Sequence, residues 1–164
     1  MPILVEVVSL AVEEAFDRRP AIGQRFLVPA QKLLTRARPI LVNGVSRCVG
    51  ERHGSGIKLG VMNVDLFVPE LNFVFGEATN TLRTAVFSIA RLDRRVYGEP
   101  QNDVILIRRA INEAVHELGH VFGLGHCNRP SCVMWFSNML SETDRKGSKF
   151  CQNCAKLLNS SLTQ

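Results

Sequence analysis

The chain has 164 residues, of which 46% are hydrophobic and 21% charged, with a formal net charge of +5 at pH 7. This composition is typical of one compact domain with a real core and excludes a disordered or fibrous protein. No Lys/Arg tract with interleaved aromatic residues is present, so we expect no nucleic-acid partner. A solvated basic surface, or attraction of acidic peptides, accounts for the charge.

Residues 1–19 are predicted to form a helix, because polar and apolar side chains recur on opposite faces at helical spacing. The polar face is Glu6, Ser9, Glu13 and Asp17, and the apolar face is Val8, Val12 and Ala15. The segment has no basic start and is interrupted early by acidic residues, so it is neither a signal peptide nor a membrane span. No other apolar run is long enough to cross a bilayer. We therefore expect a cytoplasmic protein, unless a precursor segment has been removed.

The next part of the chain is predicted to alternate between short extended and helical pieces. An extended stretch over 25–29 leads into a helix over Gln31–Arg38, which Pro39 ends or bends. A second helix fits residues 40–49, and residues 51–56 form a loop rich in glycine.

The middle of the chain is predicted to be rich in strands. The segments Ile57–Val64, Phe73–Glu77 and Ala85–Leu92 each combine β-branched or aromatic residues with flanking turn signals. A long helix follows over Val104–Phe122, with Asp103 as its N-cap. The apolar stripe of this helix is Ile111, Val115, Leu118 and Phe122. The tail from Cys127 is predicted to be short of regular structure.

Three of the four histidines fall within HELGHVFGLGH, residues 116–126. His116 and His120 are four residues apart, so on a helix both project from one face and can hold one zinc ion. Gly123 stands where the helix is expected to end, since glycine adopts the left-handed conformation of a C-terminal cap. His126 can then turn back as a third ligand. This leaves a fourth coordination position open for water, as a catalytic zinc site requires.

Glu117 is rotated about 100° from His116 around the helix, so it does not share the tetrahedral site easily. It can reach a zinc-bound water, whose pKa the metal lowers to about 7, and take its proton. The same carboxyl group can then deliver that proton to a leaving amine. A chance match to all five fixed positions is improbable, and Glu117 with an open ligand position argues against a purely structural metal site.

Four of the five cysteines cluster near the C-terminus, and these are Cys127, Cys132, Cys151 and Cys154. Two close pairs separated by a loop are typical of a closed Cys₄ zinc site. A disulfide pair or free buried thiols are the alternatives. Metal here can supply folding energy that the tail's few apolar residues do not, and can anchor the chain just after His126. Cys48 is expected to be a small buried apolar residue.

The pattern HExxHxxGxxHCx₄CxMxF with a distant CxxC resembles the archaemetzincin family of the metzincin zinc metalloproteases. The resemblance covers residues 57–154, including the segments 64–78 and 85–92, whereas the first fifty residues match poorly and show no clear initial strand. It implies two zinc ions per chain, one catalytic and one structural. It also implies a methionine beneath the catalytic zinc, for which Met134 is the candidate and Met139 the second choice.

The resemblance further implies an α+β, metzincin-like (zincin) fold. In it, a small mixed, twisted sheet with flanking helices precedes the active-site helix and a short irregular subdomain stapled by zinc. We expect one catalytic domain over 1–164, divided into subdomains 1–123 and 124–164. By its place in the chain, the segment Phe73–Glu77 is the candidate for an antiparallel edge strand that pairs with substrate. Its members are Phe73, Val74, Phe75, Gly76 and Glu77.

The sequence thus predicts a zinc-dependent peptidase in which Glu117 activates a zinc-bound water. A weakly catalytic protein that uses the metal cleft to bind peptides or partners is one alternative. A nucleic-acid reader built on the Cys₄ module is another. We expect peptide or protein substrates, no membrane partner and, for the oligomeric state, a monomer. No side chain is identified that would stabilise the oxyanion beside the zinc ion itself, because Tyr97 lies far from the motif and no tyrosine follows Met134.

Overall fold

The computed structural model describes residues 2–18, 40–50, 56–69 and 71–163. The N-terminal helix α1 (Pro2–Phe16) confirms the first predicted element. Its buried side chains recur every four residues, at Leu4, Val8, Val12 and Phe16. The extended stretch predicted over 25–29 and the helix over Gln31–Arg38 lie outside the described residues. The helix predicted over 40–49 is present as α2 (Val42–Gly50).

The strands of the described residues form two small mixed sheets of three strands each, where the sequence led us to expect one sheet. In the first, β3 (Leu66–Val68) pairs in parallel with β1 (Ile40–Leu41) and antiparallel with β4 (Leu71–Val74). In the second, β6 (Thr84–Ser88) pairs in parallel with β2 (Lys58–Met62) and antiparallel with β5 (Gly76–Thr79). Strands β4 and β5 therefore each lie at the edge of a sheet.

The predicted strand Phe73–Glu77 is wrong as a single element, because the chain crosses between the two sheets within it. β4 ends at Val74 and β5 begins at Gly76, with Phe75 between them. The Phe75 side chain is buried in the core, and its carbonyl oxygen accepts a hydrogen bond from the Ser88 N–H at 2.8 Å. Because Phe75 is apolar and faces the core, residues 73–77 look like one continuous strand in the sequence, although the chain changes sheets there.

The predicted strand Ala85–Leu92 is too long at its C-terminal end. β6 stops at Ser88, and the backbone N–H of Leu92 turns back to the carbonyl oxygen of Ile89 at 3.1 Å. The predicted strand Ile57–Val64 is present as the shorter β2. A short 3₁₀ helix, η2 (Arg94–Tyr97), follows the turn after β6.

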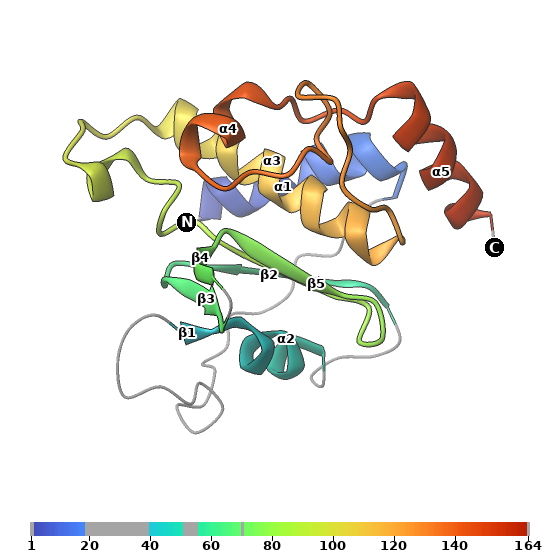
Figure 1. Ribbon diagram of the computed structural model, residues 1–164, viewed down its shortest axis with the longest axis horizontal. Helices are drawn as coiled ribbons and strands as arrows, with labels where there is room; N and C mark the ends of the chain where they lie inside the picture. Colours follow the sequence, from blue (N-terminus) through green and yellow to red (C-terminus); the bar gives the residue numbers. More distant parts are fainter. Residues whose placement is uncertain (1, 19–39, 51–55, 70, 164) are drawn as a thin grey trace.

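Helices cover both faces of the β layer (Figure 1). Helices α1 and α3 (Asp103–Val121) lie on one side and α2 on the other. β6 is buried along its whole length, so its side chains enter two cores. Phe87 packs in the main cluster with α1 and α3, and Val86 packs in the smaller cluster with Val45 of α2. Helix α3 therefore packs directly against the sheet that contains β6.

The long helix α3 confirms the predicted element and its apolar stripe. Val115 and Leu118 are buried, and Ile111 and Phe122 are partly buried against the same core. The N-cap, however, is Asn102 rather than Asp103, because the Asn102 side chain accepts a hydrogen bond from the Ile105 N–H at 3.0 Å.

The tail, predicted to be short of regular structure, holds more of it than the sequence indicated. It contains α4 (Leu140–Arg145) and α5 (Gln152–Leu162). Both helices are short and mostly polar, and α5 buries only Cys154 and Leu158, so its apolar periodicity was too sparse to detect. The described residues contain no helix with both the length and the apolar character needed to span a membrane.

Candidate functional site

The C-terminal end of α3 turns the chain through a glycine cap. Gly123 has a φ of +86°, and its N–H donates to the carbonyl oxygen of His120 at 2.9 Å. The next N–H, of Leu124, reaches back to the carbonyl oxygen of Gly119 at 3.0 Å. This pair of bonds is a Schellman motif, which satisfies the last carbonyls and reverses the chain direction. The reversal brings His126 back over the helix.

The three histidines of the motif converge. The Nε2 atoms of His116 and His120 are 3.1 Å apart, and the candidate ligand atoms of all three residues lie within 4.8 Å of one another. Two ligands of a tetrahedral zinc ion, each at 2.0–2.1 Å, stand roughly 3.4 Å apart. The arrangement therefore fits one zinc ion held by three imidazoles.

Backbone carbonyls fix the orientation of two of these rings. His116 Nδ1 lies 2.7 Å from the carbonyl oxygen of Val133, and His120 Nδ1 lies 2.7 Å from that of Leu124. A carbonyl oxygen only accepts, so each Nδ1 carries the hydrogen and each Nε2 keeps its lone pair for a metal. Burial lowers the pKa of His116 well below 6.5, and also lowers the pKa of His120 and His126. All three rings are thus held in the neutral form that metal binding needs.

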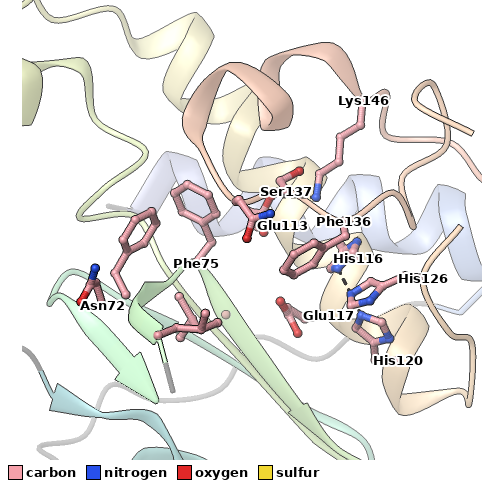
Figure 2. Close-up of a pocket in the computed structure, with 15 residues that line it drawn as sticks. Asn72, Phe75, Glu113, His116, Glu117, His120, His126, Phe136, Ser137 and Lys146 are labelled. Carbon is pink, nitrogen blue, oxygen red and sulfur yellow. Dashed lines mark hydrogen bonds and ion pairs between the residues drawn. The ribbon is translucent and has the colours of Figure 1, made fainter. Parts of the chain in front are cut away.

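Glu117 points into the same site from the next position on α3 (Figure 2). Its side chain is buried, and burial raises its pKa well above 4.5, with the nearby charge of Glu113 as the second cause. A divalent cation at the histidines would oppose this shift by favouring the carboxylate. The Glu117 carboxyl group can therefore hold a proton when no cation is bound at the histidines and release it when one is.

Met134 lies beneath the helix at the histidine site. It is fully buried, and a Cβ atom added to Gly119 would collide with its sulfur atom. The backbone carbonyl of Met134 accepts a hydrogen bond from the Cys127 N–H at 2.9 Å. Met139, the second choice, is 56% exposed and belongs to the surface instead.

The histidines open into a cleft of about 340 Å³ between α3, strand β4 and the segment after Met134 (Figure 2). β4 and the crossing into β5 form one wall, with Phe73, Phe75 and Gly76 among its residues. Glu77 does not line the cleft, because it turns to the other side and accepts a hydrogen bond from Ser46 at 2.9 Å. The guanidinium of Arg91 sits 4.3 Å above the ring of Phe73, which holds this wall in place.

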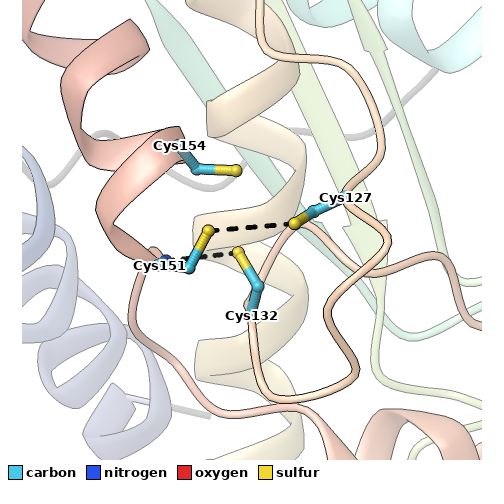
Figure 3. A group of neighbouring side chains, drawn as sticks. All are labelled: Cys127, Cys132, Cys151 and Cys154. Atoms are coloured by element: carbon cyan, nitrogen blue, oxygen red, sulfur yellow. Dashed lines mark hydrogen bonds between the residues drawn. The ribbon is translucent and has the colours of Figure 1, made fainter.

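The four C-terminal cysteines also converge (Figure 3). Their sulfur atoms all lie within 4.8 Å of one another, and those of Cys127 and Cys151 are 3.8 Å apart. That separation is far longer than a disulfide bond but matches two thiolates on one tetrahedral zinc ion, roughly 3.8 Å apart. None of the four forms a disulfide bond in this structure, so the geometry favours a metal site over the disulfide alternative. Cys48 lies in α2, and its side chain is outside the described part of the chain.

Backbone N–H groups support the sulfur atoms of this cluster. The Cys151 N–H points at the sulfur of Cys132 at 3.3 Å, and the Arg129 N–H at that of Cys127 at 3.5 Å. The backbone N–H of Cys154 is the main cause that lowers the pKa of Cys151 to about 6, whereas burial raises the pKa of Cys154. The cluster thus already favours one thiolate, the form that binds metal.

Among the polar cleft-lining residues that the sequence analysis did not single out are Glu113, Ser137 and Lys146. Glu113 could have been found, since it precedes Glu117 by four residues and so lies on the same face of α3. Lys146 and Ser137 carried no signal, because their approach to the site depends on the fold of the tail.

Comparisons with known proteins place both clusters inside one family. The family model described as "Peptidase family M54" matches residues 48–160, which include the three histidines and the four cysteines. The chain belongs to peptidase family M54. The resemblance stated from the sequence is thereby confirmed.

Two of the relatives that the chain resembles are named archaemetzincin. The archaemetzincin of Thermococcus kodakarensis is 49% identical over 110 residues, which are 67% of this chain and 59% of the relative. That of Pyrococcus horikoshii is 47% identical over 106 residues, 65% of this chain and 56% of the relative. The chain spans less than two thirds of the length of each of these relatives.

Solved structures of archaemetzincins show the same fold. The structure from Methanopyrus kandleri has a TM-score of 0.89 and 34% identity, and the match covers 99% of this chain and 88% of that one. The structure from Archaeoglobus fulgidus, complexed with malonate, has a TM-score of 0.82 and 31% identity over 96% of this chain and 93% of that one. The expected α+β, zincin-like fold is therefore confirmed for this M54 chain.

Proposed function

We propose that this protein is a zinc-dependent peptidase whose active centre is the histidine site of α3. The observation that carries the proposal is the convergence of three imidazoles beside a buried carboxyl group in an open cleft. His116, His120 and His126 are the proposed ligands of the catalytic zinc. The archaemetzincin relatives and the M54 family model support the same reaction class.

Bound zinc supplies a Lewis acid that polarises a peptide carbonyl and acidifies water. Glu117 is the proposed general base that takes the proton from the attacking water. Its buried position makes the protonated form easy to hold, so it can keep the proton until the leaving amine accepts it. Because the backbone at Gly76 packs against this side chain, the carboxyl group has little freedom to turn away.

The peptide is proposed to bind along the wall formed by β4 and the crossing at Phe75. β4 is an edge strand, paired on one side with β3. An open edge offers main-chain hydrogen bonds to an extended peptide, whatever its sequence. Phe73 and Phe75 form an edge-to-face pair, with ring centroids 5.3 Å apart, that gives this wall an apolar surface for substrate side chains.

The second zinc ion is proposed to bind Cys127, Cys132, Cys151 and Cys154 and to be structural. All four positions are taken by protein ligands, so no position remains for substrate. We also propose that residues 1–164 form one catalytic domain. The main core unites Val8 of α1, Val115 of α3 and Leu158 of α5, so the two proposed subdomains share it.

The test is cleavage of a diverse peptide library by the zinc-loaded protein beside a Glu117→Gln variant. This substitution keeps the shape of the side chain but removes its ability to accept a proton. We expect cleavage by the first protein and a loss of at least about a hundredfold in the second, with both zinc ions retained. Equal cleavage by both would show a contaminating protease, and cleavage by neither would favour the peptide-binding alternative.

A further inference from the structure

Lys146 brings a positive charge into the cleft. It is the one lysine or arginine among the cleft-lining residues that the structure describes. Its side chain is 1% exposed, and its Nζ lies 2.9 Å from Oε1 of Glu113, whose side chain is 3% exposed. Figure 2 shows the ammonium group directed at Glu113 from the segment above α3.

The position of this lysine is built by several contacts between α3 and α4. Arg109 holds Asp144 through two bonds, Nε to Oδ1 at 2.8 Å and Nη2 to Oδ2 at 2.6 Å. Asn112 Nδ2 donates to the backbone carbonyl oxygen of Lys146 at 3.1 Å. The hydroxyl group of Thr143 adds a bond to Glu113 Oε1 at 3.3 Å. The lysine is therefore fixed at the C-terminal end of α4, with its charge turned inward.

Stability does not explain such a pair. Removing two charges from water costs several kcal/mol for each ion, and well-packed apolar residues often replace buried ion pairs without loss. A buried lysine that also faces a cleft is thus better explained by what enters the cleft.

The wall that carries Lys146 adjoins the reacting centre. Glu113 stands one helical turn before Glu117 on α3, and Ser137 comes three residues after Met134. Lys146, His116 and Glu117 all line the same cleft, which places the ammonium group beside the histidine site. A group bound here would belong to a residue next to the scissile bond.

Two donor groups on this wall, an ammonium and a hydroxyl group, can still bind a hydrogen-bond acceptor of a ligand. The lysine ammonium has three N–H donors, and within the described parts of the chain its ion pair with Glu113 occupies one of them. The hydroxyl oxygen of Ser137 is buried and has no hydrogen-bond partner among the described residues. Buried polar groups without partners are uncommon and indicate a missing ligand or water.

The net charge of the cleft-lining residues and a bound metal ion would favour an anionic ligand. A bound divalent cation and Lys146 would together bring three positive charges, against two negative charges from the carboxylates of Glu113 and Glu117. A carboxylate has two acceptor oxygens, so it can take bonds from an ammonium and a hydroxyl group at once and leave the cleft neutral.

We propose that Lys146, with Ser137, forms a subsite for a carboxylate group of the substrate beside the scissile bond. The inference rests on the proposed peptidase function and names its substrate class. The carboxylate belongs either to an aspartate or glutamate side chain or to the free C-terminus of the peptide. In the first case the protein prefers acidic residues, and in the second it releases C-terminal residues.

The test measures how tightly the zinc-loaded protein binds four short peptide hydroxamates. The four share the metal-binding hydroxamate and differ only in the residue next to it and in the C-terminal group. These carry aspartate with a C-terminal amide, asparagine with an amide, alanine with a free carboxylate, and alanine with an amide. The hydroxamate reports on the histidine zinc site, and the neighbouring group reports on Lys146. We expect one of the two carboxylate probes to bind at least about tenfold more tightly than its neutral partner. The probe that gains affinity identifies the source of the carboxylate.

The matched variant is Glu113→Gln with Lys146→Met, which removes the ion pair without leaving one charge buried. Lys146→Arg keeps the charge, and Lys149→Met removes a lysine whose side chain is 82% exposed. We expect the preference for a carboxylate to vanish in the double variant and to persist in the other two. Folding and zinc content are checked in each by circular dichroism and metal analysis.

Three outcomes would overturn the inference. If all four hydroxamates bind equally well, the metal site stands but the carboxylate subsite does not. If a carboxylate preference survives in the double variant, Lys146 is not its cause. If none of the hydroxamates binds to the zinc-loaded protein, the proposed peptidase centre fails and the subsite fails with it.

Discussion

The backbone of Gly76 lies directly against the side chain of Glu117. A Cβ atom added at Gly76 would stand 2.7 Å from both Cγ and Oε1 of Glu117, and 2.7 Å from the carbonyl oxygen of Val86. These separations are shorter than van der Waals contact, and one of the three neighbours is backbone. The beginning of β5 and the proposed general base therefore fit together only while residue 76 has no side chain.

Gly76→Ala is expected to displace Glu117 and to lower peptide cleavage by about a hundredfold while both zinc ions stay bound. Misplacing a catalytic group by about an ångström is enough for a loss of that size. Cleavage rates and metal content measured on the same sample check the prediction. Gly56→Ala is the matched control, because a Cβ atom there would meet no atom within 4 Å. Equal activity of the two variants would contradict the proposed role of Gly76.

His116→Ala is expected to remove one zinc ion per chain and leave the other in place. The variant loses an imidazole from the histidine site, whereas the four cysteine sulfur atoms keep their geometry. Metal analysis after dialysis against a mild chelator should fall from two zinc ions to one. Cys154→Ser is the converse variant and should lose the cysteine-bound ion. Retention of both ions in His116→Ala would show that the ligand assignment is wrong.

Gly119→Ala is expected to destabilise the protein by about 1–3 kcal/mol, because the new methyl group overlaps Met134 in a closely packed core. The direction is informative, since glycine to alanine inside a helix otherwise stabilises by roughly 1 kcal/mol. Denaturant unfolding of the zinc-loaded proteins measures the change. A gain in stability would mean that Met134 does not press against the helix.

The histidine site could be predicted from the sequence because its ligands are local. His116 and His120 are joined by one helical turn, and Gly123 supplies the cap that returns His126. The spacing alone therefore determines their approach. The same holds for the paired cysteines at each end of their loop.

The two-sheet arrangement and the Lys146 subsite could not be predicted in this way, because long-range packing creates them. Phe75 looks like the middle of a strand, and only the pairing of its neighbours with β3 and β6 shows the crossing. Lys146 reaches Glu113 across 33 positions of the chain because Arg109 and Asn112 hold α4 against α3. Neither relationship has a periodic signature.

Glu117→Gln is expected to stabilise the protein at pH 8 when the histidine site holds no metal. Burial raises the pKa of Glu117 above 4.5 in the folded state. As the pH rises from 4.5 to the folded pKa, the unfolded chain therefore loses this proton before the folded one does. The free energy of unfolding of the wild-type protein thus decreases across that range, and glutamine removes the loss.

The measurement is denaturant unfolding at several pH values, after the histidine site is emptied with a mild chelator and the cysteine-bound zinc is shown to remain. The gain from Glu117→Gln should shrink as the pH falls towards 4.5. Glu14→Gln, at a side chain that is 75% exposed, is the control and should show no such trend. A gain that does not vary with pH would contradict the proposed buried ionisation.

The two metal sites are expected to be coupled, because the cysteine cluster holds the backbone that positions the histidines. Cys127 follows His126 directly and bonds through its N–H to the carbonyl oxygen of Met134. Cys132 precedes Val133, whose carbonyl oxygen fixes the ring of His116. Loss of the cysteine-bound zinc should therefore loosen two of the three proposed ligands of the catalytic ion.

Cys151→Ser is accordingly expected to weaken zinc binding at the histidine site by about 10–100-fold, as is typical when the groups that orient metal ligands are lost. Competition with a chromophoric chelator measures that affinity, with Cys48→Ser as the control on α2, on the other side of the sheet (Figure 1). An unchanged affinity, with the cysteine site shown to be empty, would mean that the glycine-capped turn after α3 orients the histidines without help from the second metal.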